Sequence, residues 1–555
     1  MNPPLTFIDL FCGCGGFTLG MLRAGFQCKA AIDFNHQVVE TLKANLADRC
    51  PPEATSVEYA LEKNLTTFSP AELAGLIGTK QLDVIVGGPP CQGFSTARQR
   101  DGSNHGSKRF KEDPRRHLYR HFLDYVEFFQ PRVFVIENVL GLRNAAGGRY
   151  FTAVQHEARI LGRDKGHPGY RVHGQIEKAE ELGVPQKRRR QLIIGLRADL
   201  PGYFPSELQP AARATAHTML GDAIGDLPVL AAGEGVHASP YDLDRRDRQF
   251  LGGVRDAVRR RYLQGVAEVQ HAELLTNHIA RPHSARDLRD FALLPEGTSS
   301  AKLMREGVEF EFPYDKTTFK DRYTRQHRNR PCSTIVAHLS KDGLMFIHPT
   351  QNRSLTPREA ARVQSFPDWF VFLEARTHAF RMIGNAVPPL IGESVGLAIQ
   401  EFFTAVVAYP LKSAEILQHE PALSTIPSSL AEAKMWLEIL MHLSVRELRK
   451  LSAPDFLRGW HALLWLFPGL HPDNALDHGL EKLDWPEAQQ VLPFLPPAER
   501  KFYPRSGWPC SLVLIGGEAW RRFKADEIND DEFYCVEAQR ARLDSARLAP
   551  PAGSH

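Results

Sequence analysis

The chain has 555 residues, of which 24% are charged and 43% hydrophobic. This ordinary composition excludes collagen-like, low-complexity and wholly disordered proteins, and at roughly 100–200 residues per domain the length allows about three domains. The chain contains no apolar run near the ~20 residues that span a bilayer, and its start lacks a basic signal-peptide region. We therefore expect a cytoplasmic protein with no membrane partner.

The net charge of +3 is unevenly distributed along the chain. Residues 411–555 hold 16 Lys and Arg against 20 Asp and Glu, and six of the seven Trp lie there. Residues 1–410 are basic, which favours contact with a polyanion. Pro and Ser accumulate in 408–429, so we expect a linker at 406–429 and a mostly helical C-terminal domain of unknown role at 430–555.

The eight cysteines are too sparse for a disulfide framework. Cys12 and Cys14 lie close together, but no second Cys or His pair follows at zinc spacing. We expect reduced thiols and no metal site.

Strand and helix patterns alternate through the first 200 residues. Strands are expected at 5–11, 28–34, 82–88, 132–139 and 190–197, and helices at 38–47 and 119–129. The strands are nearly continuously apolar, which is typical of a parallel sheet covered on both faces. The sequence thus predicts an α/β, doubly wound sheet over 1–199. Irregular turns and arginine runs follow, and helical patterns return at 355–370 and 381–403.

Glycines follow the first expected strand, where Gly13 and Gly15 lie, and Asp33 ends the second strand. Such glycines let a ligand approach the backbone, and an acid about 20 residues later can bind ribose hydroxyls. Thr18 stands where a dinucleotide fingerprint has its third glycine, which disfavours a nicotinamide-dependent oxidoreductase. The pattern indicates a nucleoside cofactor without a pyrophosphate.

Three further segments carry groups suited to chemistry. Cys91 follows two prolines on a loop at the end of an expected strand, so it is a candidate nucleophile rather than an inert buried thiol. Glu137 ends another strand, where it can hydrogen-bond a ligand nitrogen or cap a helix. In the run 186–190, strand periodicity puts Gln186, Arg188 and Arg190 on one face, where they can converge on one ligand, although such runs are more often basic surface.

Six segments together resemble the cytosine-C5 DNA methyltransferases. FIDLFCGCGG, GGPPCQGFS, ENV, QKRRR, RSLTPREAARVQSFPD and GNAVPP occur in the order and approximate spacing of that family, over roughly residues 5–405. Six ordered motifs are far more specific than any one. The resemblance implies an S-adenosylmethionine-dependent methyltransferase sheet, a small irregular target-recognition region at 200–345 and the rest of the catalytic domain at 346–405. It also implies S-adenosyl-L-methionine as cofactor, double-stranded DNA as partner and a bacterial restriction-modification or defence role.

The resemblance also assigns roles to matched residues. Cys91 matches the nucleophile, Glu137 the cytosine-binding acid, and Arg188 and Arg190 the basic pair beside the base. Many relatives have an aspartate facing the adenine where this chain has Asn64, which can still accept a hydrogen bond. The positions that match the cofactor pocket are Phe11, Gly13, Gly15, Asp33, Phe34, Asn64, Leu65, Pro90, Leu118, Asn385 and Val387.

This constellation suits the chemistry, because cytosine C5 is a poor nucleophile until the base is activated. Attack of the Cys91 thiolate on C6, with Glu137 at N3 and Arg190 at the O2 side, makes C5 carbanion-like. The base must leave the duplex to reach Cys91.

Two alternatives remain beside this interpretation. RNA (tRNA) cytosine-C5 methyltransferases share the scaffold but usually carry a Cys-Phe-Thr signature, which this sequence lacks. A catalytically silent DNA-binding protein is disfavoured by the intact Cys91, Glu137 and Arg190. Arginine runs at 244–262 and 320–330 are expected to contact phosphates. The C-terminal Trp residues are either core or a docking surface for a restriction or defence partner, and we expect a monomer.

Overall fold

The structure is a computed structural model of the whole chain. It describes residues 3–46, 60–90, 117–144, 149–197, 207–241, 256–272, 274–312, 323–341, 343–373, 375–417, 430–443 and 445–466, with ten single residues between and beyond these ranges. The chain forms two compact units. One comprises Met1–Val154, Ile176–Leu192 and Leu208–Leu397, and the other comprises Gln155–Gln175, Ile193–Glu207 and Ala398–His555.

A mixed seven-stranded sheet has the strand order β3-β2-β1-β4-β5-β7-β6. The strands are β1 (Thr6–Leu10), β2 (Gln27–Asp33), β3 (Ala60–Glu62), β4 (Val84–Gly87), β5 (Val133–Asn138), β6 (Tyr170–Lys178) and β7 (Arg189–Arg197). The five strands from β3 to β5 pair in parallel, and the residues of β4 and β5 are all buried. Covered strands of this kind produce the continuous apolar runs seen in the sequence.

All five expected strands are confirmed, as β1, β2, β4, β5 and β7. The short β3 and the polar β6 were missed, because three residues carry no periodicity and YRVHGQIEK has no apolar run. The two expected helices are α2 (His36–Leu46) and α4 (Leu118–Phe129). The sheet is mixed rather than wholly parallel, which corrects that part of the expectation.

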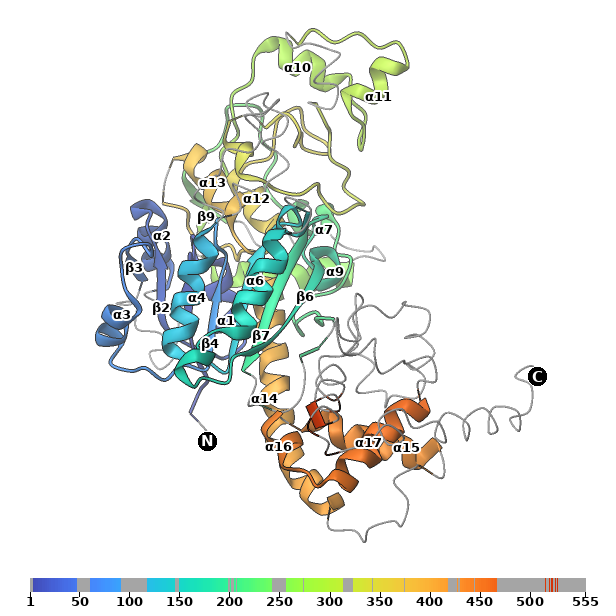
Figure 1. Cartoon of the computed structure of the whole chain (residues 1–555). Coiled ribbons are helices and arrows are strands. Elements are labelled where there is room, and N and C mark those ends of the chain that lie inside the picture. Colours follow the sequence, from blue (N-terminus) through green and yellow to red (C-terminus); the bar gives the residue numbers. More distant parts are fainter. Residues whose placement is uncertain are drawn as a thin grey trace, which may run out of the picture. The chain divides into compact units, whose positions relative to one another are not determined.

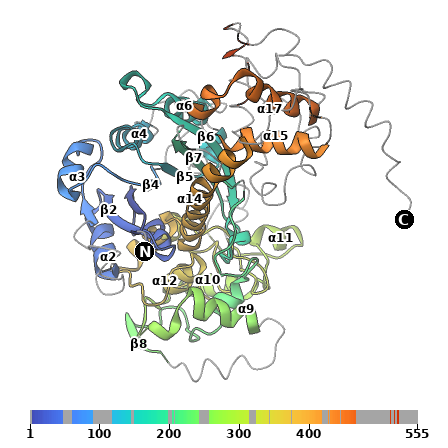
Figure 2. The same cartoon turned by 90° about the horizontal axis from the view of Figure 1, so that it is seen from below.

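Helices cover both faces of the parallel strands (Figures 1 and 2). The helix α1 (Gly16–Arg23) and α2 connect β1, β2 and β3, whereas α3 (Pro70–Ile77) and α4 precede β4 and β5. Because the strand order reverses between β1 and β4, right-handed crossovers put these two pairs of helices on opposite faces. Ligands of such sheets bind at the carboxyl ends of the strands beside this reversal.

Among the described residues between 208 and 350, regular elements are few and short. They are α7 (Leu220–Ile224), β8 (Ala238–Pro240), α9 (Asp256–Arg261), η9 (Tyr262–Val266), η10 (Val269–His271), β9 (Leu274–Thr276), α10 (Ala285–Ala292), α11 (Ser300–Arg305) and η11 (Ala337–Ser340). The lobe that carries α10 and α11 (Figure 1) has its own apolar core around Phe291, Phe312 and Tyr323. This agrees with the irregular pattern expected there.

Three helices follow, α12 (Pro357–Val363), α13 (Arg376–Asn385) and α14 (Pro389–Leu417). The two consecutive prolines of GNAVPP separate α13 from α14, because proline disfavours helical geometry in the residue before it. The helix α14 continues to Leu417, beyond the helical pattern expected at 381–403, so the start of the expected linker at 406–429 is helical. The stretch Arg376–Thr404 has the length and apolarity of a membrane span, but 89% of its most apolar window is buried in the fold.

The second unit contains α15 (Leu430–His442), α16 (Val445–Lys450) and α17 (Ala453–Leu466). Trp460 and Leu463 of α17 are fully buried, and Trp436 of α15 lies under the guanidinium of Arg458 at 5.2 Å. These two tryptophans therefore belong to the packing of this helical cluster.

Candidate active site

The turn that joins β1 to α1, residues 11–15, holds an unusual backbone. Phe11, Gly13 and Gly15 have positive φ angles of 59°, 56° and 87°. The backbone N–H of Gly13 donates to Asp33 Oδ2 at 3.0 Å. Burial raises the pKa of Asp33, although this N–H and that of Asn35 oppose the shift. A carboxylate at the end of β2 thus fixes the conformation of the turn, which we call the cofactor turn.

Phe34 follows Asp33 and exposes 68% of its surface beside this turn. An exposed aromatic ring at the carboxyl end of a parallel strand offers a face on which a base can stack. Leu65 is buried and Asn64 exposed in the neighbouring segment. The Oδ1 of Asn64 accepts hydrogen bonds from the backbone N–H and the hydroxyl of Thr66, at 3.1 and 2.9 Å. The oxygen expected to face the adenine is therefore already engaged locally.

The segment around Val387 lies directly against α1. A Cβ added to Gly16 would lie 2.0 Å from the carbonyl oxygen of Val387, and one on Gly20 would lie 2.4 Å from that of Pro389. Only glycine permits such an approach of two backbones. Asn385, at the end of α13, is exposed, and Val387 is 9% exposed. The carbonyl of Val387 thus lies against the first residue of α1, directly after the cofactor turn.

The loop before the candidate nucleophile is held by β5. The side-chain amide of Asn138 donates to the carbonyl of Pro89 at 3.0 Å. A Cβ on Gly88 would lie 3.5 Å from Glu137 Oε2, so the loop backbone passes close to that carboxylate. Pro90 is half-buried, and Cys91 lies outside the described residues. Sequence reasoning missed Asn138, although it stands in ENV beside Glu137.

Glu137 and Arg190 meet beside this loop. Arg190 Nε lies 2.7 Å from Glu137 Oε1, and their side chains are 11% and 10% exposed. An acid and a base that are paired but still reachable from solvent can both hydrogen-bond one ligand. Leu118, at the start of α4, is half-buried.

Arg188 has a different environment from Arg190. Its side chain is 1% exposed, and it donates to the carbonyls of Ile335 and Ala386, both at 2.9 Å. Gln186 is also fully buried. The prediction that Gln186, Arg188 and Arg190 converge on one ligand is therefore corrected: the guanidinium of Arg188 is directed to backbone carbonyls.

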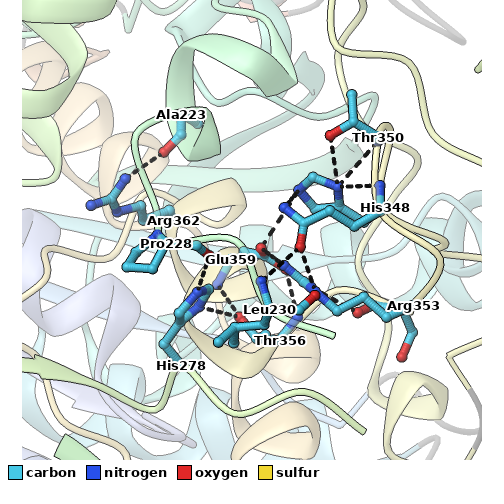
Figure 3. A network of polar contacts seen from close by, with 12 residues as sticks. Ala223, Pro228, Leu230, His278, His348, Thr350, Arg353, Thr356, Glu359 and Arg362 are labelled. Atoms are coloured by element: carbon cyan, nitrogen blue, oxygen red, sulfur yellow. Dashed lines mark hydrogen bonds and ion pairs between the residues drawn. The ribbon is translucent and has the colours of Figure 1, made fainter. Parts of the chain in front are cut away.

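A buried polar network supports α12 (Figure 3). Arg353 donates to both oxygens of Glu359, at 2.8 and 2.7 Å, and Thr356 N donates to Glu359 Oε2 at 2.7 Å. Burial alone would raise the pKa of Glu359, but the charge and hydrogen bonds of Arg353 keep it well below its usual range. His278 contacts Thr356 Oγ1 at 3.0 Å and the carbonyl of Pro228 at 2.9 Å. The network therefore joins α12 to segments before residue 280.

Arg362 extends this network on the same helix. Its guanidinium pairs with Asp226 at 2.5 Å and with Asp368 at 2.6 Å, and all three side chains are fully buried or nearly so. It also donates to the carbonyl of Ala223 at 2.9 Å (Figure 3). The buried charges of RSLTPREAARVQSFPD thus connect α12 to the irregular region.

The arginine run 259–261, expected to contact phosphates, lies in α9. Arg261 donates to the carbonyl of Ala212. The chain then passes through η9 to Glu268, whose carboxylate pairs with Arg23 at 2.6 Å. Arg23 ends α1, and the cofactor turn precedes the start of this helix. The segment that follows the run therefore contacts the C-terminal end of α1, and phosphate contact by the run itself stays a prediction.

Several known proteins are similar to most of this chain. Residues 5–401 match the protein family described as C-5 cytosine-specific DNA methylase. The type II methyltransferase M.DdeI of Desulfomicrobium norvegicum is 32% identical over 413 residues, covering 72% of this chain and 89% of the relative. M.XorII of Xanthomonas oryzae pv. oryzae is 32% identical over 426 residues, covering 74% and 87%.

A solved structure is similar as well. It is a DNA modification methyltransferase encoded within a prophage of E. coli, with 26% identity and a TM-score of 0.52. The match covers 72% of this chain and 99% of that chain. The C-terminal quarter lies outside the family match.

Proposed function

The chain belongs to the family of C-5 cytosine-specific DNA methylases, and we propose that it is the modification enzyme of a type II restriction-modification system and acts through Cys91. As a DNA (cytosine-5-)-methyltransferase it uses S-adenosylmethionine and methylates C5 of cytosine in DNA. The restriction-modification role rests on the type II relatives.

One observation carries the proposed site: the pair Glu137–Arg190 lies beside the loop that leads to Cys91. The Cys91 thiolate forms a bond to C6 of an extruded cytosine, which places negative charge on the ring. Glu137 hydrogen-bonds N3 and Arg190 the O2 side, so both contacts strengthen as that charge grows. After transfer, loss of the C5 proton expels the thiolate and restores the ring.

The cofactor fits residues that the fold brings together. The cofactor turn and Asp33 present backbone N–H and carboxylate groups for the ribose and methionine parts, and Phe34 offers a face for the adenine. Asn385 at the end of α13 and Val387 in the turn before α14 would close the same pocket, and the close approach of the Val387 carbonyl to Gly16 supports this. The bound cofactor supplies an electrophilic methyl group, and the protein's part is to hold it against C5 of the base.

The remaining assignments concern the outer regions of the chain. We assign target recognition to 200–345, with the catalytic domain formed by 1–199 and 346–405. We assign to 430–555 a helical domain that docks a restriction or defence partner, because its acidic balance disfavours a second contact with DNA. The protein acts as a cytoplasmic monomer on double-stranded DNA.

A covalent trap tests this proposal. With S-adenosylmethionine present, DNA carrying 5-fluorocytosine at the target should form an adduct that survives denaturing electrophoresis, because fluorine replaces the proton that must leave. Peptide mapping should place the adduct on Cys91, and Cys91→Ala should form none. An adduct at another residue, or methyl transfer by Cys91→Ala above about 1% of wild type, would remove Cys91 from this role.

A further inference from the structure

Three polar side chains form a fully buried group between the cofactor pocket and the irregular region. They are Gln186, Arg188 and Gln364, none more than 1% exposed. Polar groups are buried at a cost unless they are hydrogen-bonded, so their partners indicate what the group does. We call these three side chains the Arg188 group.

Gln186 donates to Gln364 and to the carbonyl of Val363 in α12, and further partners of the Arg188 group lie on two other segments. Both backbone groups of Ile335 are hydrogen-bonded. Its N–H donates to Gln186 Oε1 at 3.0 Å, and its carbonyl accepts from Arg188 at 2.9 Å. The carbonyl of Ala386 accepts twice, from Arg188 at 2.9 Å and from Gln364 at 3.1 Å.

The two segments have different roles in the proposed site. Ala386 stands between Asn385 and Val387, which line the cofactor pocket. Ile335 precedes η11, from which His338 projects exposed in the region assigned to target recognition. One planar guanidinium, whose donors have a fixed geometry, thus sets the position of both segments.

We propose that Arg188 is a positioning residue that fixes the cofactor segment 385–387 and the recognition segment beginning at Ile335 in one arrangement, and that it makes no contact with the cytosine. This rests on the proposed function for the identity of the two segments. It assigns to the first arginine of QKRRR a role different from that of Arg190, whose guanidinium faces Glu137.

The test uses binding without catalysis. S-adenosylhomocysteine is titrated into the full-length protein in the absence of DNA. No cytosine is then present, so a residue that acts only on the base cannot affect the dissociation constant. Arg188→Met should raise the dissociation constant about tenfold or more, since a lost hydrogen bond to a charged donor has that effect. Arg190→Met should leave it within about twofold. Arg188→Lys should give an intermediate value, because one ammonium reaches one of the two carbonyls.

Two milder variants separate the segments and keep the test informative if Arg188→Met fails to fold. Gln364→Met, on the Ala386 side, should weaken S-adenosylhomocysteine binding more than DNA binding. Gln186→Met, on the Ile335 side, should weaken DNA binding more than S-adenosylhomocysteine binding. DNA binding is measured by the fluorescence anisotropy of a labelled duplex. Thermal unfolding of each variant reports any general loss of stability.

The outcomes distinguish this inference from the proposed function. If Arg188→Met binds S-adenosylhomocysteine like wild type and loses only methyl transfer, Arg188 acts at the base and the inference is wrong. It is also wrong if Gln186→Met and Gln364→Met weaken both ligands equally. If the wild-type protein methylates no DNA yet shows the expected pattern with S-adenosylhomocysteine, the proposed function fails and the positioning of the cofactor segment stands.

Discussion

Replacement of Gly16 by alanine should separate α1 from the cofactor segment. The added Cβ would lie 2.0 Å from the carbonyl oxygen of Val387. Because carbon–oxygen contacts ordinarily begin near about 3.3 Å, the two backbones must shift apart by about 1 Å. Overpacking of this kind costs about 1–3 kcal/mol. We expect the free energy of unfolding to fall by that amount and S-adenosylhomocysteine binding to weaken, since Val387 is one of the residues proposed to line the cofactor pocket.

Gly75→Ala is the matched control. Gly75 lies in the exposed part of α3, and a Cβ there meets nothing within 4 Å. Alanine in a helix interior is favoured over glycine by about 0.8–1 kcal/mol, so this variant should be slightly more stable and bind the cofactor analogue like wild type. Urea denaturation and calorimetric titration measure both quantities. A Gly16→Ala protein with unchanged stability and unchanged binding would refute the close packing of α1 on the cofactor segment.

Three further changes test buried groups of the catalytic unit. Burial raises the pKa of Asp9 to about 7 despite its hydrogen bond from Thr18, so the folded state holds a proton that the unfolded state releases between about pH 4 and 7, and stability falls as pH rises through that window. Asp9→Asn should flatten the pH dependence of the free energy of unfolding measured in urea, and an unchanged dependence would contradict this reasoning. Glu359→Gln leaves the Arg353 charge without its carboxylate and should cost about 3–5 kcal/mol of unfolding free energy, whereas a loss below about 1 kcal/mol would count against the network. Asn138→Ala removes the hydrogen bond to the carbonyl of Pro89, in the loop that leads to Cys91, and should lower kcat by about tenfold or more with little change in the KM for S-adenosylmethionine. A rise in this KM as large as the fall in kcat would mean that Asn138 acts at the cofactor instead.

Much of the sheet was predictable, because parallel strands buried on both faces appear in the sequence as nearly continuous apolar runs. The runs at 5–11, 82–88 and 132–139 became β1, β4 and β5, and their carboxyl ends carry the cofactor turn, the Cys91 loop and Glu137. Motif order alone could therefore group these residues at one edge of the sheet. The side-chain contacts of the site residues could not be predicted from the sequence pattern.

The role of Arg188 shows why. Strand periodicity places Arg188 and Arg190 on one face, but β7 begins only at Arg189, so the pattern does not extend to residue 188. The partners of Arg188, at Ile335 and Ala386, are 147 and 198 residues away in the sequence. Long-range contacts to backbone carbonyls leave no local signal, because any residue supplies the same carbonyl.

The buried charges of α12 escaped prediction for a related reason. The segment PREAARV reads as a solvated helix with charges on its surface, yet Arg358, Glu359 and Arg362 are fully buried. Their partners include Thr276 and Asp226, which come from the irregular region. Only the resemblance to a known family indicated that the segment was special, and it did not indicate that its charges are internal.

The central claim is that this chain methylates cytosine at C5 within a specific duplex sequence. Bisulfite sequencing of DNA from cells that express the full-length protein tests it most directly, with cells expressing Cys91→Ala as control. We predict protected cytosines at one recurrent sequence on both strands in the wild type and none in the variant. Absence of protected cytosines in the DNA of cells that contain soluble wild-type protein, or equal protection with Cys91→Ala, would contradict the account.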